Sequence, residues 1–360
     1  MTTRRGFLAT LAAAAGSLPR LAWADAGSPA FLAAARDADG SFALYGVGAD
    51  GTDRFRLPLP ARGHAGAVHP TEPLAVAFAR RPGTFAVVLD CVTGARLATL
   101  DSPEGRHFMG HGSFSPDGRL LYTAENDFVT TRGKIGIWSR DDGWTRIAEL
   151  ESHGTGPHDV QFLPDGVTLV VANGGIETNP AKGRAKLNLP TMRPSLVYLD
   201  LDGRLLEEVV LPEAAHRASI RHLAVAPDGQ VGFAMQWEEM PETAPPLLGL
   251  HRRGEAPVMA EAGEAQARLM KGYVGSVAVS RDGGLFAVSC PRGGRAVVFD
   301  KAGALVQVIE RADVCGLAPM GAGFVLTDGV GGLLRLEGGR LTALGARARA
   351  WDNHAVSLRA

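Results

Sequence analysis

The chain has 360 residues, and 37 Lys and Arg nearly balance 38 Asp and Glu, which leaves a formal net charge of −1. Without a basic excess or a basic run, the composition argues against a nucleic-acid-binding protein. No apolar run in it reaches the roughly 18–20 residues that a membrane-spanning helix needs. The length allows a large core, as one repeat-built domain or as two ordinary domains.

The N-terminus has the order of features of an export signal. Thr3–Leu8 reads TRRGFL, an Ala/Leu-rich stretch follows, and Ala22-Trp23-Ala24 resembles a cleavage site. We therefore expect residues 1–24 to be a twin-arginine signal peptide and 25–360 to be one domain, exported in folded form to the periplasm. The alternative is a chance Arg pair before an Ala-rich helix.

A unit of about 40–50 residues with four short strands repeats along the rest of the chain. Most units begin with a strand that runs into a Pro-Asp-Gly or similar tight turn, where Pro presets φ and Gly accepts φ > 0. The predicted strands and turns, in chain order, are 31–35, 42–46 and 54–59; 67–68, 74–79, 84–90 and 96–100; 110–127, 134–139 and 145–150; 157–166, 168–175, 195–200 and 205–211; 220–229, 231–237 and 246–254; 274–283, 285–290, 295–300 and 305–309; and 313–323, 324–332, 333–339 and 341–345.

This repeat predicts an all-β fold, a β-propeller with seven blades, although six or eight remain alternatives. The first unit lacks its leading strand, and the chain ends with an unpaired one, Trp351–Leu358. We expect this last strand to lie innermost in the first blade and so to close the ring. Two longer segments, Ile176–Pro194 and Glu238–Pro246, fall between second and third strands, and loops of that length are usually functional or mobile.

Polar residues recur at the start of the predicted innermost strands, which ring one mouth of the central channel. They are His64, His111, His158 with Asp159, Arg221 with His222, Ser276, Asp313, and Asn353 with His354. The loops between second and third strands open on the same face. They carry Glu125, Asn126, Asp127, Asn173, Glu177, Asn179, Gln236, Glu238, Arg292 and Asp328. Both sets therefore converge on one rim.

A single His at this position can be structural, as in WD-repeat propellers, where it bonds a neighbouring turn. Several His from different blades favour a site instead, because a buried polar ring is costly without partners or a ligand. Neutral imidazoles with carboxylates suit Zn²⁺, Fe²⁺/Fe³⁺ or Cu²⁺. Alternatively, Arg and His side chains at this rim would grip an anionic substrate.

The three cysteines form an odd set, so at least one thiol stays free in an oxidising compartment. Cys315 is expected on an innermost strand and Cys290 at the end of a second strand, both near the mouth. Each is either a buried apolar thiol, a soft metal ligand, or half of a disulfide between adjacent blades. Cys91 lies at an outer turn.

Known catalytic motifs do not occur in the sequence. There is no Gly-x-Ser-x-Gly, no His-Glu-x-x-His and no Cys-x-x-Cys-His, and the Gly-rich pieces lie in turns rather than between a strand and a helix. Nucleophilic hydrolysis, a single-helix zinc site and covalent haem therefore have no support in motif form.

Several long segments resemble one bacterial family. They include residues 110–127 (GHGSFSPDGRLLYTAEND), 220–229 (IRHLAVAPDG), 290–294 (CPRGG) and the terminal WDNH at 351–354. The chain is similar to the domain-of-unknown-function family 1513, exported proteins with a seven-bladed propeller like that of quinoprotein amine dehydrogenase and YVTN-repeat proteins. The resemblance implies a setting beside imelysin-type and di-haem peroxidase-like proteins, and hence iron or metal acquisition. It supplies no catalytic residues.

From these patterns we expect a periplasmic binding or accessory protein, a monomer, that holds a transition-metal ion (Fe, Cu or Zn), a metal chelate or a small anion at the channel mouth. The expected metal ligands are His111, His158, His222 and His354, with Asp159 and Cys315 as further candidates. Arg221, Glu125, Asn126, Asp127, Asn173, Gln236 and Arg292 would support the ligands or bind an anion. A lactonase-like hydrolase, an oxidoreductase and a protein-interaction platform remain alternative functions, with periplasmic iron-system proteins as possible partners.

Overall fold

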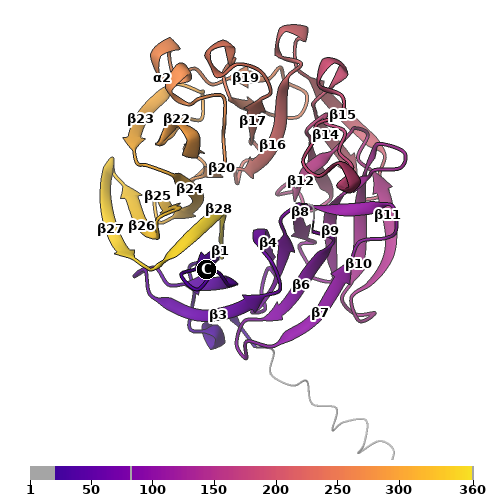
Figure 1. The fold of residues 1–360 in the computed structure, drawn as a ribbon, viewed down its shortest axis with the longest axis vertical. Coiled ribbons are helices and arrows are strands. Elements are labelled where there is room, and N and C mark those ends of the chain that lie inside the picture. The colour runs from indigo at the N-terminus through magenta and orange to yellow at the C-terminus, as the bar shows by residue number, and fades with distance from the viewer. Residues whose placement is uncertain (1–20, 82, 359–360) are drawn as a thin grey trace, which may run out of the picture.

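Seven four-stranded antiparallel sheets form a closed ring in the computed structural model, which describes residues 21–81 and 83–358. The innermost strands surround a central channel (Figure 1). Arg4 and Arg5 of the expected export signal lie outside the described residues. Within the described ranges, no helix combines the length and the apolar character needed to cross a membrane.

Each sheet is one blade, and its strands run from the channel outward in chain order, except that the last strand of the chain leads the first blade. The innermost strands are β28 (Arg349–Ser357), β4 (Gly63–Val68), β8 (Arg106–Phe114), β12 (Pro157–Phe162), β16 (Ala218–Val225), β20 (Ser276–Val279) and β24 (Val314–Met320). The second strands are β1 (Phe31–Asp37), β5 (Leu74–Ala79), β9 (Leu120–Asp127), β13 (Thr168–Asn173), β17 (Val231–Trp237), β21 (Leu285–Cys290) and β25 (Gly323–Asp328).

The outer half of each blade is built from the remaining strands. The third strands are β2 (Phe42–Val47), β6 (Phe85–Asp90), β10 (Arg132–Ser139), β14 (Ser195–Asp200), β18 (Leu248–His251), β22 (Arg295–Asp300) and β26 (Gly332–Glu337). The outermost strands are β3 (Asp53–Leu59), β7 (Arg96–Asp101), β11 (Thr145–Glu151), β15 (Leu205–Val210), β19 (Val258–Met259), β23 (Leu305–Glu310) and β27 (Arg340–Ala346). The seven blades and the closure by β28, which pairs with β1, are confirmed.

Burial falls from the second strand to the outermost one. Every residue of β5, with the sequence LAVAFA, is buried, because both faces of the strand pack against neighbouring blades. In β7 only Leu100 is buried. This explains why second strands read as continuous apolar runs while outermost strands alternate with polar residues.

The tight turn at residues 115–118 shows how the Ser-Pro-Asp-Gly sequence fixes a hairpin. The Ser115 hydroxyl donates to Asp117 Oδ1 at 2.6 Å and accepts from the Leu120 amide at 3.0 Å. Gly118 has φ +73°, and a Cβ there would lie 2.0 Å from His69 Nε2. Only glycine therefore fits this position.

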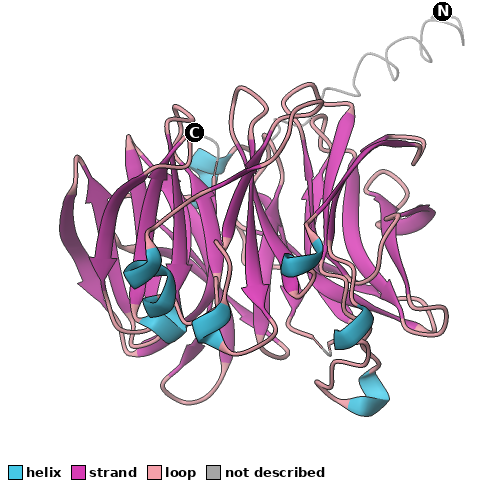
Figure 2. Cartoon of the chain, turned by 90° about the horizontal axis from the view of Figure 1, so that it is seen from above, coloured by secondary structure: helices cyan, strands magenta, loops and turns pink. Residues whose placement is uncertain are grey.

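The short helices gather on one face of the ring (Figure 2). Apart from η1 (Trp23–Ala26), all lie in connections that open on the face where the innermost strands begin: η2 (Pro180–Lys182), η3 (Leu189–Thr191), η4 (Glu213–Ala215), η5 (Pro241–Thr243), α2 (Glu264–Leu269) and η6 (Pro291–Gly293). We call this face the mouth face. The two longer segments predicted to lie between second and third strands are confirmed there, since η2 and η3 belong to the first and η5 to the second.

Candidate functional site

Five histidines from five adjacent blades meet in the channel. The five-histidine cluster consists of His64 on β4, His111 on β8, His158 on β12, His222 on β16 and His354 on β28. Neighbouring rings lie with their centroids 4.5 to 4.9 Å apart in the pairs His64–His354, His111–His158 and His222–His354. The four expected metal ligands thus come together, and His64 joins them.

Irregular strand pairing aims these side chains at the channel. The register with the neighbouring second strand shifts at or beside the histidine in all five strands. A β-bulge bends a strand and redirects its side chains, so residues that would otherwise pack between blades can point along the sheet edge. The sequence predicted these histidines just before the innermost strands, whereas they lie within them.

Gly110 makes room for the cluster. It has φ +98°, and a Cβ at this position would lie 2.4 Å from Cδ2 of the His64 ring. Any other residue would have to adopt a left-handed conformation and displace the ring. The position of the His64 ring, on the adjacent blade, therefore explains why the residue before His111 is glycine.

All five rings are buried, with 3 to 9% of their surface exposed. Burial lowers the pKa of each below the ordinary value of 6.5, well below it for all except His64, and the proximity of the other rings lowers most of them further. The imidazoles are therefore neutral at neutral pH, which is the form that binds a metal.

Six buried ring nitrogens of the cluster have no hydrogen-bond partner among the described residues. They are His64 Nδ1, His111 Nε2, His158 Nδ1, both nitrogens of His222, and His354 Nε2. Donor atoms of two triads, each containing His111, lie within 4.8 Å of one another: His64, His111 and His158, and His111, His222 and His354. Imidazole nitrogens are good ligands for Zn²⁺, Cu²⁺ and Fe²⁺, so the donor set fits a first-row transition metal.

Two buried aspartates flank the cluster. Asp159 Oδ1 lies 3.6 Å from His111 Nδ1, and burial raises the pKa of Asp159 to about 7, although the Leu223 amide donates to it at 3.0 Å. Asp352 Oδ1 lies 3.9 Å from His64 Nδ1. Burial raises its pKa, but the His64 ring and the Arg62 guanidinium lower it to about 2. The cluster thus has one permanent anion on one side and, on the other, an acid that exchanges its proton near neutral pH.

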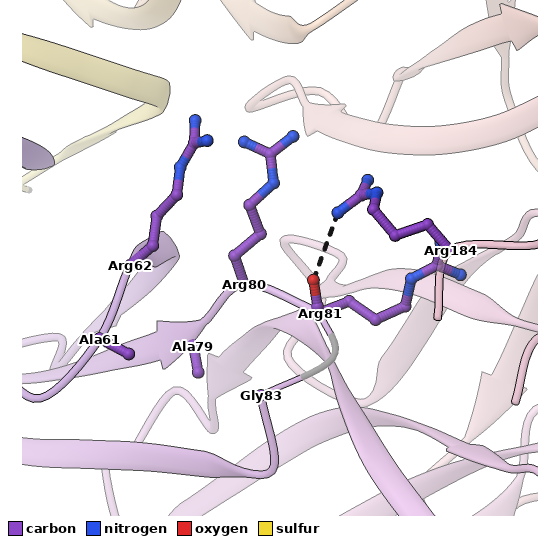
Figure 3. Close-up of a pocket in the computed structure, with 7 residues that line it drawn as sticks. All are labelled: Ala61, Arg62, Ala79, Arg80, Arg81, Gly83 and Arg184. Atoms are coloured by element: carbon purple, nitrogen blue, oxygen red, sulfur yellow. Dashed lines mark hydrogen bonds between the residues drawn. The ribbon is translucent and has the colours of Figure 1, made fainter. Parts of the chain in front are cut away.

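An arginine-lined pocket of about 600 Å³ opens on the mouth face. Its lining includes Arg62, Arg80, Arg81 and Arg184. In Figure 3 the Arg62 and Arg80 side chains extend side by side in the same direction, and the Arg184 side chain reaches the Arg81 carbonyl. Arg62 Nε bonds Asp352 at 2.5 Å, and Arg80 Nη1 lies 3.6 Å from the same carboxylate. Asp352 therefore connects the pocket to the cluster. Arg221, beside His222, pairs with Glu238 at 3.4 Å.

Sequence reasoning did not single out His64 or these pocket arginines as ligands. His64 does stand at the start of a predicted innermost strand, like the other four histidines. Arg80 and Arg81 follow a second strand directly, which places them on the mouth face, and Arg184 belongs to the long segment 176–194. The position of each in the repeat was the available signal.

The expected acidic and amide groups of blade three are used within the fold. Glu125 accepts from Thr123 Oγ1 at 2.8 Å and pairs with Arg146 at 2.9 Å. Asp127 accepts from two backbone amides of the following turn, at 3.0 Å each. Asn126 donates to the Thr178 carbonyl at 3.1 Å and so ties down the long segment 176–194. The structure does not bring these groups into the five-histidine cluster.

The remaining expected binding residues also have partners of their own. Asn173 Nδ2 donates to the Ser152 carbonyl at 2.9 Å, and Gln236 Nε2 donates to the Val274 carbonyl at 3.0 Å. The Arg292 guanidinium lies over the Tyr273 ring, 4.3 Å from its centroid. These bonds hold the connections of the mouth face in place.

The cysteines are not part of the site. All three are free and buried, and burial raises the pKa of Cys290 and of Cys315 to about 12. Cys315 Sγ lies 3.6 Å from the Trp351 carbonyl and from Thr327. It belongs to neither of the donor triads found among the described residues. The thiol packs inside the ring, and the expected alternative of a disulfide between blades is not formed.

Comparison with known proteins gives the fold and the family. No curated protein matches the chain. A solved structure of hydrazine synthase from Kuenenia stuttgartiensis is similar, with a TM-score of 0.62 and 14% identity over 86% of this chain and 90% of that one, a likeness that shows the fold alone. The family model described as "Protein of unknown function (DUF1513)" matches residues 57–358. Since that match covers most of the sequence, the chain belongs to the DUF1513 family.

Proposed function

We propose that this protein binds a first-row transition-metal ion at the five-histidine cluster and serves as a periplasmic binding or accessory protein in metal handling. The observation that carries the proposal is the set of six buried, unpartnered ring nitrogens. Burying a polar atom without a partner costs about 1–3 kcal/mol each in proteins. A bound metal ion would recover part of that cost, because each neutral imidazole that ligates it contributes the lone pair of one ring nitrogen.

The chemistry of the donor atoms restricts which metal ions the cluster would bind. A set of imidazoles favours Zn²⁺, Cu²⁺ or Fe²⁺ over Mg²⁺ or Ca²⁺, which prefer oxygen ligands. Cu²⁺ is expected to bind most tightly in vitro because it stands highest in the affinity order of divalent metals. Which of these ions is carried in the cell depends on availability, and the setting implied by the family resemblance favours iron.

A titration of metal-free protein with Zn²⁺, Cu²⁺ and, under anaerobic conditions, Fe²⁺ tests the proposal. We expect tight binding that His111→Ala/His222→Ala weakens at least about a hundredfold, since losing ligands removes several kcal/mol of binding free energy. His153→Asn is the matched control, because His153 is exposed and, among residues 21–81 and 83–358, its ring bonds only the Gly203 carbonyl, at 3.0 Å. Absence of binding, or equal affinity in both variants, would refute the proposal.

A further inference from the structure

The arginine pocket carries more positive charge than its own carboxylates neutralise. We define the arginine mouth as Arg62, Arg80, Arg81, Arg184 and Arg221. Asp352 forms ion pairs with both Arg62 and Arg80, and Glu238 forms ion pairs with Arg221 and Lys186. Among the described residues, two carboxylates thus lie within 4.0 Å of these cations, which comprise five guanidinium groups and one ammonium group.

Two members of the arginine mouth have no acidic partner. Within residues 21–81 and 83–358, no carboxylate lies within 4.0 Å of the Arg81 or Arg184 guanidinium, and Arg184 Nη1 donates only to the Arg81 carbonyl, at 3.3 Å (Figure 3). Burial, together with the neighbouring charges of Arg221, Arg184 and Arg80, lowers the pKa of Arg81 to about 10, and Glu238 opposes this shift only in part. Like charges held this close are unfavourable unless an anion joins them.

Arg221 gives an independent indication. Its side chain is 11% exposed, and its buried Nε has no hydrogen-bond partner among the described residues. A guanidinium group offers five donors in a planar fork that matches the two oxygens of a carboxylate or phosphate. The Nε donor of Arg221 has no partner although the residue is buried beside other arginines, which indicates that this surface binds an oxyanion.

We propose that the arginine mouth binds a small polycarboxylate that carries the metal as its chelate and delivers it to the five-histidine cluster. This inference rests on the proposed function and adds the class of the metal's carrier. A polycarboxylate supplies oxygen ligands to the ion and leaves free carboxylates for the arginines. Asp352 lies within 4.0 Å of Arg62, Arg80 and His64, so one carboxylate joins the pocket arginines to the cluster.

Citrate is the probe, with acetate and inorganic phosphate for comparison, titrated into metal-free full-length protein. We expect citrate to bind more tightly than either and Arg81→Gln/Arg184→Gln to weaken it about tenfold or more, because each bond to a charged group is strong. Citrate affinity should also fall as salt rises, because salt screens the charges. The control is Arg119→Gln/Arg204→Gln, which removes two exposed arginines from turns on the opposite face.

The histidine variants separate this inference from the proposed function. His111→Ala/His222→Ala should weaken metal binding at least about a hundredfold and leave citrate binding unchanged. Arg81→Gln/Arg184→Gln should weaken citrate binding and leave the binding of metal added as the simple salt unchanged. Metal supplied as its citrate complex should load the wild type and fail to load the arginine variant. Citrate affinity equal in the arginine and control variants, or phosphate bound as tightly as citrate, would overturn the inference. A melting curve for each variant verifies folding.

Discussion

Two groups of buried histidines differ in how their nitrogens are used. His69, His107 and His251 lie in the blades, and the ring nitrogens of each are bonded: His251, for example, bonds Tyr198 Oη at 2.7 Å and the Glu255 carbonyl at 2.9 Å. The five-histidine cluster, by contrast, has six ring nitrogens without a hydrogen-bond partner in the part of the chain that the structure describes. The blade histidines therefore behave as parts of the fold, whereas the ring nitrogens of the cluster are not used by the fold.

The blades that lack a channel histidine support this distinction. The sixth and seventh blades carry Ser276 and Cys315 near the equivalent positions, and both form complete four-stranded sheets. In the seventh blade the pairing shifts between Val314 and Leu317, much as it does beside the histidines. Ring closure and the bulge thus do not require imidazole, so the five histidines need another explanation.

The largest expected effect is stabilisation by metal. At a free metal concentration 100 times the dissociation constant, wild-type protein should gain about 2.7 kcal/mol of unfolding free energy, because the ion binds the folded state. The gain is measured by urea unfolding with Zn²⁺ and with a chelator. The His111→Ala/His222→Ala variant should show little or no gain, and an equal gain would place the ion elsewhere.

A blade histidine should matter for stability whether metal is present or not. His251→Leu removes two hydrogen bonds and leaves the buried Tyr198 hydroxyl without its 2.7 Å partner. We expect the unfolding free energy to fall by about 1–3 kcal/mol. Metal affinity should stay at the wild-type value. Weaker metal binding in this variant would mean that the two groups are not independent.

Acid should destabilise the metal-free protein because the histidines of the five-histidine cluster are buried in their neutral form. In the unfolded chain these histidines take up protons near their ordinary pKa of 6.5, while burial keeps their folded-state pKa lower. The unfolded state then binds more protons, so stability is full above about pH 6.5 and falls as the pH drops toward the folded pKa values. Asp159 has the opposite effect, because its pKa is raised to about 7 and the folded state therefore binds this one proton more tightly than the unfolded state does.

The corresponding measurement is urea unfolding of chelator-treated protein between pH 7.5 and 5. His111→Ala/His222→Ala should have a shallower slope, since it lacks two of the five groups. An unchanged slope would show that acid sensitivity arises elsewhere in the molecule.

The smallest effect on stability is expected for a substitution within the five-histidine cluster itself. His222→Leu replaces a ring with two unpartnered nitrogens by an apolar side chain. Without metal, the unfolding free energy should change by less than about 1 kcal/mol, or even rise, because an unpaired polar group is removed. If His222→Leu lowered the unfolding free energy as much as His251→Leu does, the cluster histidines would be as important to the fold as the blade histidines, which contradicts the distinction drawn above.

The sequence predicted the architecture well because the repeat is carried by local signals. Pro-Asp-Gly turns at residues 116–118, 164–166 and 227–229 and similar tight turns in other blades follow the innermost strands, and largely apolar runs mark the second strands. The position of β28 follows from the missing leading strand of the first unit. The gathering of histidines on one rim followed from strand order alone.

The details of the site depend on side-chain direction, which strand order does not determine. Glu125 and Asn173 were predicted in the loops after second strands, but they lie within β9 and β13, and their side chains bond within the blades. His64 reaches the cluster through a bulge and through the space left by Gly110. Bulges and glycine contacts between blades are tertiary features, so the pattern of one strand does not reveal them.

X-ray absorption spectroscopy of the Zn²⁺-loaded protein tests the central claim most directly. The five-histidine cluster predicts at least three imidazole nitrogens at about 2.0–2.1 Å from the ion, and fewer after His111→Ala, because His111 belongs to both donor triads. A first shell made only of oxygen, or a spectrum that His111→Ala leaves unchanged, would contradict the account.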